Sequence, residues 1–173
     1  MANAYDADPA SPLARTLISR SRANVLQGVA IAAHAIGARE AIFYMHPEAE
    51  AERRSMDEDI VVRREGLAPL TVTVAQGPGG FMGGEESALM NVLESRRAMA
   101  RQRPPYPAES GVQQRPTLIS SAETLAWLPQ IVDGGGFSSE IFLMNLGGTI
   151  ANPRLSLLSP QGQPIKMEFI QPR

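Results

Sequence analysis

The chain has 173 residues, which is enough for one domain with a full hydrophobic core. It has no cysteine and a net charge of −2, which excludes disulfides and cysteine-bound iron–sulfur clusters in this sequence and argues against nucleic-acid binding. The longest apolar run, residues 29–36, is much shorter than the ~20 residues of a membrane span. The acidic N-terminal sequence is unlike a signal peptide, so we expect a cytoplasmic protein without direct membrane insertion.

The first half of the sequence predicts helices that alternate with strands. Pro12 and Gly37 bound a stretch whose apolar residues recur every three or four positions, as in an amphipathic helix. Ile60-Val61-Val62 is compatible with a strand, but the acidic start of its segment favours a helix. The predicted elements are a helix over 12–36, a strand over 41–45, a helix over 47–66 and a strand over 70–75.

The second half begins with a glycine loop and a predicted helix over residues 85–98. Residues 99–118 are rich in Pro, Arg and Gln and predict an extended surface loop. Ser120 or Ser121 can cap the next helix, which runs through Thr124–Trp127. Three consecutive glycines then mark a boundary near residue 134. Beyond it, three strands are predicted over 141–146, 154–158 and 165–170.

The segment Gly79-Gly-Phe-Met-Gly-Gly-Glu-Glu86 combines a glycine loop with two acids at the start of a helix. A glycine loop before a helix often binds phosphate, but carboxylates at the same helix end repel an anion. Neither the dinucleotide-binding nor the P-loop glycine pattern is present. From these residues alone, a purely structural turn remains an alternative to a ligand site. His34 and His46 lie in different elements, so we expect no metal site.

Four segments in this order resemble the flavin-bearing, NADH-oxidising subunit of respiratory complex I. The segments are Asn3-Ala-Tyr-Asp-Ala-Asp-Pro9, Gly84-Glu-Glu-Ser-Ala-Leu-Met-Asn91, Arg103-Pro-Pro-Tyr-Pro-Ala108 and Arg115-Pro-Thr117 followed by Glu123-Thr-Leu-Ala126. The resemblance implies an α/β fold, with a Rossmann-like three-layer FMN-binding domain over residues 1–133. Residues 134–173 resemble the start of the small ubiquitin-like (SLBB, β-grasp) domain that follows in the family, as an incomplete β-rich segment.

The implied function is that of an NADH dehydrogenase (NADH:quinone oxidoreductase) flavoprotein module, in which hydride passes from NADH to FMN. Other subunits of such a complex, or missing parts of a longer chain, are the implied partners. Gly84, Glu85 and Glu86 would border the flavin and the nicotinamide, and Glu86 would stabilise the positive charge that develops as hydride leaves. Phe81 stands where the family has a tyrosine beside the nicotinamide.

The remaining implied site residues contact other parts of the two nucleotides. Arg103 and Tyr106 match residues that hold the adenosine half of NADH, and Asn3 matches an asparagine that contacts the flavin. Asp6 and Asp8 correspond to acids of the same segment. Ser120 and Ser121 replace paired asparagines, whose side chains reach further.

The sequence also departs from the family pattern. It has no glycine-rich loop for the flavin phosphate, it has Tyr5-Asp6 where Asp-Glu is expected, and it has no cysteine for the family's iron–sulfur domain. We therefore expect weak FMN binding or none, and no autonomous activity, in the isolated chain. A diverged, non-catalytic relative that acts as a scaffold or interaction subunit is the alternative.

Overall fold

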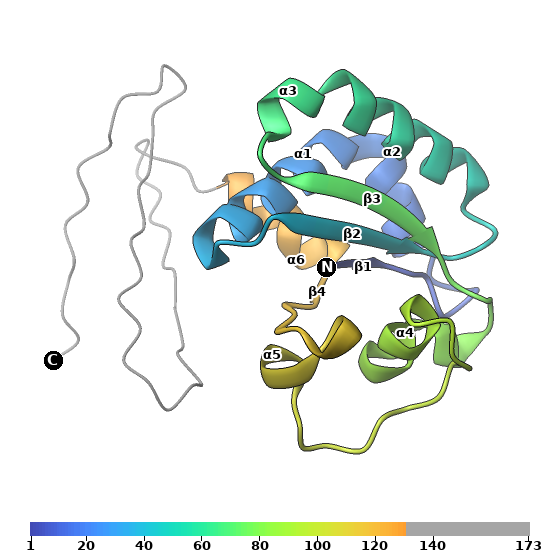
Figure 1. The fold of residues 1–173 in the computed structure, drawn as a ribbon. Helices are drawn as coiled ribbons and strands as arrows, with labels where there is room; N and C mark the ends of the chain where they lie inside the picture. The colour runs from blue at the N-terminus through green and yellow to red at the C-terminus, as the bar shows by residue number, and fades with distance from the viewer. Residues whose placement is uncertain (131–173) are drawn as a thin grey trace, which may run out of the picture. The chain divides into compact units, whose positions relative to one another are not determined.

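The computed structural model describes residues 1–130 (Figure 1). The predicted β-rich segment 134–173 and its three strands lie outside the described residues. The strands are β1 (Ala2–Ala4), β2 (Glu40–Met45), β3 (Thr71–Gln76) and β4 (Ser120–Ser121). The α-helices are α1 (Leu13–Ile36), α2 (Glu50–Val62), α3 (Arg64–Leu67), α4 (Glu86–Leu93), α5 (Pro107–Ser110) and α6 (Ala122–Trp127), with 3-10 turns η1 (Phe81–Gly84), η2 (Val112–Gln114) and η3 (Leu128–Gln130).

The four strands form one parallel sheet in the order β3-β2-β1-β4. Each of the six residues of β2 pairs with one residue of β3, from Glu40 with Thr71 to Met45 with Gln76. Because all the strands are parallel, their carboxyl ends lie along one edge of the sheet. In open parallel sheets this is the edge at which ligands bind.

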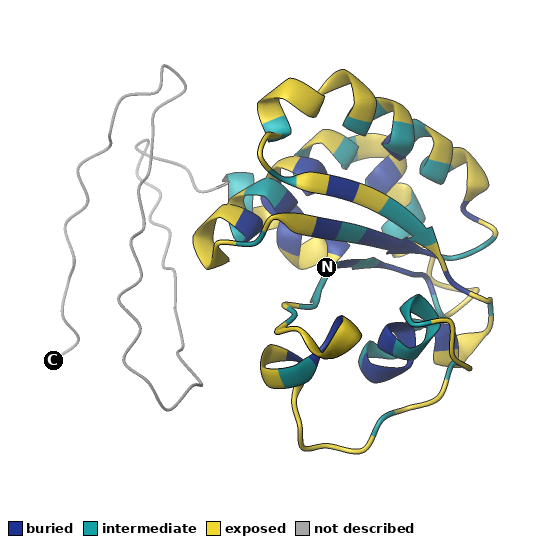
Figure 2. Cartoon of the chain, viewed as in Figure 1, coloured by how far each residue is buried: buried dark blue, intermediate teal, exposed yellow. Residues whose placement is uncertain are grey.

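Helices cover both faces of the sheet, so the predicted three-layer α/β architecture is confirmed (Figure 1). Phe43 and Met45 of β2 belong to the core that also contains residues of α1, α2 and α6. Tyr44, on the opposite face, belongs to a second core with Leu89 and Met90 of α4. This alternation follows from the two-residue period of a strand, and it buries β2 on both faces (Figure 2).

The helix predicted over residues 85–98 is shorter in the structure and ends at Leu93. Ser95 adopts a left-handed conformation with φ of 59°, and the Arg96 N–H donates to the carbonyl of Asn91 at 2.8 Å. Together with the bond from Ser95 N to the carbonyl of Val92 at 2.9 Å, this closes the helix as a Schellman motif. The motif usually uses glycine, so a serine in that position gave no signal in the sequence.

Three further predictions need adjustment. The predicted helix 47–66 is interrupted at Arg63, between α2 and α3, and Ile60–Val62 is helical. The predicted helix 12–36 begins at Leu13 and is kinked at Ser21, whose φ and ψ of −142° and 27° are not helical. The expected extended loop 99–118 contains the short helices α5 and η2.

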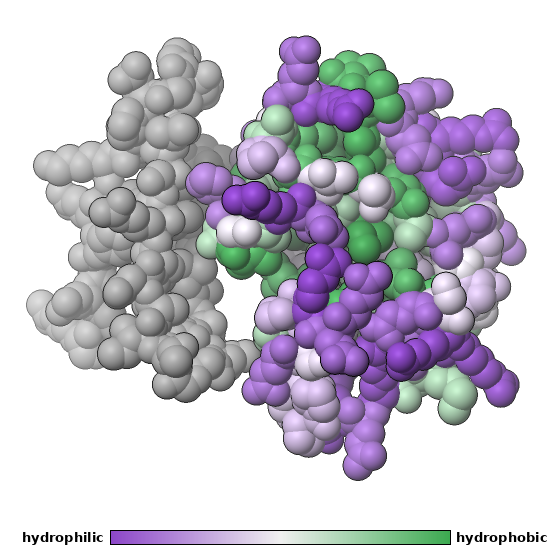
Figure 3. All heavy atoms as spheres, viewed as in Figure 1, coloured by the Kyte–Doolittle hydropathy of each residue, from purple (hydrophilic) through white to green (hydrophobic). Residues whose placement is uncertain are grey.

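The surface is mainly hydrophilic over the lower part of the view in Figure 3, with hydrophobic atoms exposed near the α2–α3 end. Val61 and Val62, at the end of α2, are 72% and 83% exposed. No helix within residues 1–130 is long and apolar enough to cross a membrane.

Candidate nucleotide site at the carboxyl edge of the sheet

A cavity of about 760 Å³ lies at the carboxyl edge of the sheet. Its walls come from the loops that follow β1, β2 and β3 and from the first turns of α1. The lining residues are Asp6, Ala7, Asp8, Pro9, Arg15, His46, Pro47, Glu48, Pro78, Gly79, Gly80 and Phe81. A volume of this size is typical of pockets that bind small organic ligands. Three of the predicted site residues, Asp6, Asp8 and Phe81, therefore surround one cavity.

The Asp6 carboxylate caps the start of α1. Its two carboxylate oxygens accept the N–H groups of Ala14 at 2.7 Å and Arg15 at 2.9 Å, and the residue is 8% exposed. The negative charge thus occupies the positive end of the helix. Asp8 accepts the N–H of Ala10 at 2.9 Å in an exposed turn, and Phe81 is 73% exposed. Asp8 and Phe81 remain accessible to a ligand, whereas the Asp6 carboxylate is satisfied by the protein.

The inner side of the glycine segment packs against Tyr5. The Tyr5 hydroxyl donates to the carbonyl of Gly80 at 3.0 Å, and the ring stacks on Tyr44 with 5.4 Å between centroids. A β-carbon on Gly83 would lie 2.4 Å from the Tyr5 hydroxyl oxygen, and one on Gly84 would lie 2.8 Å from the ring. Glycine is needed at these positions because the chain's own aromatic ring lies against them. Burial raises the pKa of both Tyr5 and Tyr44, and the neighbouring Tyr5 adds a smaller increase to the pKa of Tyr44. Both hydroxyl groups therefore stay neutral.

Asn3, the middle residue of β1, connects the sheet to the glycine segment. Its side-chain amide donates to the carbonyl of Gly84 at 3.0 Å, and its amide oxygen accepts the N–H of Tyr5 at 3.2 Å. Asn3 pairs with Ser121 of β4, and the Ser121 hydroxyl caps α6 by accepting the Thr124 N–H at 3.1 Å. The helix cap predicted for Ser120 or Ser121 is thus Ser121.

Glu85 is the N-cap of α4 rather than its first helical residue, which corrects the expectation that both acids lie inside the helix. One carboxylate oxygen accepts the N–H of Ser87 at 2.9 Å, the N–H of Ala88 at 2.7 Å and the Ser87 hydroxyl at 2.6 Å. Burial by itself would raise the pKa of Glu85, but these hydrogen bonds and the nearby Arg103 outweigh it and lower the pKa. Glu85 therefore stays ionised at neutral pH.

Arg103 faces both acids at the start of α4. Its guanidinium forms an ion pair with Glu86 and lies 3.7 Å from the Glu85 carboxylate. The three side chains are 34% to 40% exposed. Ion pairs with this exposure contribute about 1 kcal/mol or less, so a ligand can compete for either partner. Tyr106, three residues after Arg103, is 55% exposed.

The structure thus brings together Asn3, Gly84, Glu85, Glu86 and Arg103, which lie up to 100 residues apart in the sequence. Two polar residues of this region were not predicted. Ser87 bonds to Glu85, and Arg101 bonds to Ser87 through its backbone N–H at 2.8 Å. Within residues 1–130 no cluster of His, Asp and Glu side chains is arranged to hold a metal ion.

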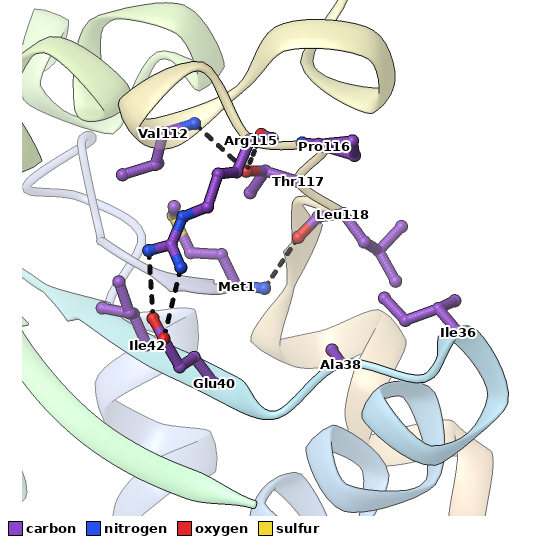
Figure 4. Close-up of a pocket in the computed structure, with 10 residues that line it drawn as sticks. All are labelled: Met1, Ile36, Ala38, Glu40, Ile42, Val112, Arg115, Pro116, Thr117 and Leu118. Carbon is purple, nitrogen blue, oxygen red and sulfur yellow. Dashed lines mark hydrogen bonds and ion pairs between the residues drawn. The ribbon is translucent and has the colours of Figure 1, made fainter.

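A second cavity, of about 190 Å³, lies at the amino edge of the sheet (Figure 4). Arg115 crosses its mouth to Glu40, with two N–O distances of 3.2 and 3.1 Å. The rest of the lining is mostly apolar and includes Ile36, Ile42 and Leu118. None of the predicted site residues lines this cavity, and it lies at the strand ends opposite those of the candidate site.

The sequence matches the family described as the Nuo51 FMN-binding domain over residues 1–130. The chain belongs to this family. It is 34% identical over 143 residues to an NADH-quinone oxidoreductase subunit of Rhizobium meliloti, the one designated F 2, covering 77% of this chain and 34% of that protein. It is 31% identical over 144 residues to the alpha subunit of the NAD-reducing hydrogenase HoxS of Cupriavidus necator, and the match covers 77% of this chain and 24% of that protein.

A crystal structure of an NAD+-reducing NiFe hydrogenase in the H2-reduced state has the same fold. It superposes with a TM-score of 0.67 at 33% identity and covers 73% of this chain and 23% of that one. The chain spans about a third of the length of the Rhizobium relative. The family match confirms the resemblance to the NADH-oxidising subunit and the expected FMN-binding fold.

The phosphate of FMN has no evident place among residues 1–130. A phosphate prefers a free helix N-terminus or a glycine-rich loop of N–H donors. At the carboxyl edge, the start of α1 is capped by Asp6, that of α4 by Glu85 and that of α6 by Ser121. The first turn of α2 carries Glu50 and Glu52. The helix starts at the carboxyl edge therefore do not suit a phosphate.

Proposed function

We propose that this chain supplies the part of an NADH-oxidising flavoprotein module that contacts the flavin ring and the nicotinamide. The observation that carries this proposal is the convergence of Glu85, Glu86 and Arg103 at the end of the glycine segment, whose first residues, Gly79, Gly80 and Phe81, line a cavity of about 760 Å³. These residues belong to the segments that resemble the NADH-oxidising subunit. The relatives named above are subunits of an NADH-quinone oxidoreductase and of an NAD-reducing hydrogenase.

FMN, when bound, supplies the hydride acceptor, and the residues of this chain bind and orient the nucleotide. The Glu86 carboxylate stabilises the positive charge that develops on the nicotinamide as hydride leaves. Arg103 and Tyr106 bind the adenosine half of NADH. Because Arg103 and Glu86 form an ion pair at 38% and 40% exposure, separating them for the nucleotide costs little.

On this proposal, the donors for the FMN phosphate come from outside residues 1–130, either from another chain or from further sequence of the same protein. Three helix starts at the carboxyl edge are already capped by side chains of the domain itself. Other subunits of an NADH dehydrogenase-type complex are accordingly the proposed partners, and they also supply the electron acceptor.

Two substitutions test the proposed roles in flavin-loaded protein. Glu86→Gln keeps the shape of the side chain and removes its charge, so we expect turnover to fall by about tenfold or more with little change in the Michaelis constant for NADH. Arg103→Ala should raise that Michaelis constant by about fivefold and leave turnover nearly unchanged. The measurement is steady-state NADH oxidation with ferricyanide as the acceptor.

Arg97→Ala is the matched control, because it removes an exposed arginine from the same stretch of chain. It should leave both kinetic parameters unchanged. If Glu86→Gln and Arg103→Ala behave like this control in an active enzyme, the assigned nucleotide site is wrong.

A second candidate function is that of a non-catalytic scaffold or interaction subunit. The specific observation in its favour is Tyr5, whose ring fills the space under Gly83 and Gly84, in a family where an acid is expected at that position. The absorption spectrum of the purified protein with its partners distinguishes the two functions. After FMN is added and unbound FMN is removed, a flavin band that stays with the protein supports the enzyme, and its absence supports the scaffold.

A further inference from the structure

Three polar residues of α4 and its C-terminal end form a stripe along one side of the helix: Ser87, Asn91 and Glu94. Their spacing of four and three residues places them on the same helical face. All three bind one residue of the following loop, Arg101. Ser87 Oγ accepts the Arg101 backbone N–H at 2.8 Å, Asn91 Oδ1 accepts its Nε–H at 2.8 Å, and Glu94 Oε2 lies 2.7 Å from its Nη2.

These contacts hold the loop against α4 at Arg101. The Asn91 side-chain amide also donates to the carbonyl of Met99 at 2.7 Å. Arg103 follows Arg101 by two residues, so its backbone lies within about 7 Å of the anchored position. The position from which Arg103 reaches Glu86 therefore depends on the contacts of Arg101.

Ser87 connects this anchor to the acids of the site. Its hydroxyl has one hydrogen, which it donates to Glu85 Oε2 at 2.6 Å, while its oxygen accepts the N–H of Arg101. Ser87 is 2% exposed, so water does not replace either bond readily. One buried hydroxyl thus links the carboxylate of Glu85 to the loop that carries Arg103.

We propose that Ser87 and Arg101 are positioning residues, which fix the loop 99–106 so that Arg103 meets the acids at the start of α4. Neither residue contacts the nucleotide. The inference rests on the proposed function only in so far as NADH is the ligand whose binding depends on Arg103. The link between Glu85, Ser87 and Arg101 is a property of the chain itself.

The test compares Ser87→Ala, Ser87→Thr and Asn91→Ala with the wild type, and Arg97→Ala is the control for a substitution that touches none of these contacts. Amide exchange followed by NMR on the 173-residue chain reports the protection of the Arg101 N–H, and a carboxyl titration reports the pKa of Glu85. NADH affinity is measured by fluorescence on the same samples. The last readout requires no flavin and no partner.

We expect Ser87→Ala to lower the protection of the Arg101 N–H by about fivefold, the factor for one hydrogen bond of ordinary strength. The pKa of Glu85 should rise, because the Ser87 hydroxyl is one of the groups that lower it. NADH binding should weaken by about fivefold. Ser87→Thr keeps a hydroxyl, so the Arg101 protection, the pKa of Glu85 and the NADH affinity should all stay at their wild-type values. Asn91→Ala should loosen the loop and weaken NADH binding without moving the pKa of Glu85.

Unchanged Arg101 protection in both Ser87→Ala and Asn91→Ala would overturn the proposal. A loosened loop with unchanged NADH affinity would also overturn it, because the contacts would then be structural only. If the wild type itself does not bind NADH, the proposed function fails in this chain. The Arg101 protection and the Glu85 titration then decide the coupling by themselves.

Discussion

Gly28→Ala is expected to destabilise the domain by about 3 kcal/mol, because the new methyl group has no space between α1 and α6. A β-carbon on Gly28 would lie 1.8 Å from the carbonyl oxygen of Leu125 and 2.6 Å from its carbonyl carbon. Both atoms belong to the backbone of α6, so the two helices must move apart. The better helix propensity of alanine offsets only about 1 kcal/mol of this cost. Thermal unfolding followed by circular dichroism should show a melting temperature lower by about 10 °C.

Gly66→Ala is the matched control for this prediction. Gly66 lies in α3, and a β-carbon there would have no atom within 4 Å. We expect the melting temperature of Gly66→Ala to be unchanged or slightly raised. A Gly28→Ala protein as stable as Gly66→Ala would contradict the close packing of α1 against α6.

The chain is expected to bind FMN with a dissociation constant above about 10 μM, because the helix starts at the carboxyl edge of residues 1–130 are capped or acidic and do not supply charge-assisted hydrogen bonds to the phosphate. Three helix starts at the carboxyl edge are capped by Asp6, Glu85 and Ser121, and the first turn of α2 carries two glutamates. Each such bond contributes about 1.5–3 kcal/mol, so two or three of them separate tight binding from weak binding. Titration calorimetry on the purified 173-residue chain measures this constant.

Riboflavin, which has the same ring system without the phosphate, is the matched control ligand. Since three helix starts at the carboxyl edge are capped by side chains and the first turn of α2 carries Glu50 and Glu52, riboflavin and FMN should bind with similar, weak affinity. A submicromolar dissociation constant for FMN, at least about a hundredfold below that for riboflavin, would reveal a phosphate site in this chain. The proposal that the phosphate is held from outside these residues would then be wrong.

Much of the fold could be predicted from local patterns. The β-branched run 70–75 and the apolar run 41–45 correspond to β3 and β2, and the apolar spacing in residues 12–36 corresponds to α1. β1 was not among the predicted strands, because three residues are too short for a periodic pattern. β4 has two residues, both serines, and forms only because β1 offers an open edge for pairing. Local sequence patterns do not predict such pairing between strands that lie far apart in the chain.

The candidate site was predicted in part. The resemblance assigned Asn3 and Gly84 to the flavin and Arg103 to the adenosine half of NADH. In the structure Asn3 bonds to Gly84, and Arg103 pairs with the acids that follow Gly84. Two features depended on three-dimensional packing. The ring of Tyr5 lies under the glycines, and Ser87 joins Glu85 to Arg101. The spacing of the polar residues along α4 was a signal for the contact of Ser87 with Arg101. The position of Arg101 against these residues depends on the course of the following loop, which local patterns do not predict.

The most direct measurement of the central claim, a nucleotide site at the carboxyl edge, is an NMR titration of the isotope-labelled chain with NADH. We expect the chemical-shift changes to concentrate in the backbone amides of residues 79–86 and 101–106 and around Asp8. The amino-edge cavity around Ile36, Arg115 and Leu118 (Figure 4) should not respond. Changes confined to that cavity, or no change at millimolar NADH, would show that the nucleotide does not bind at the carboxyl edge.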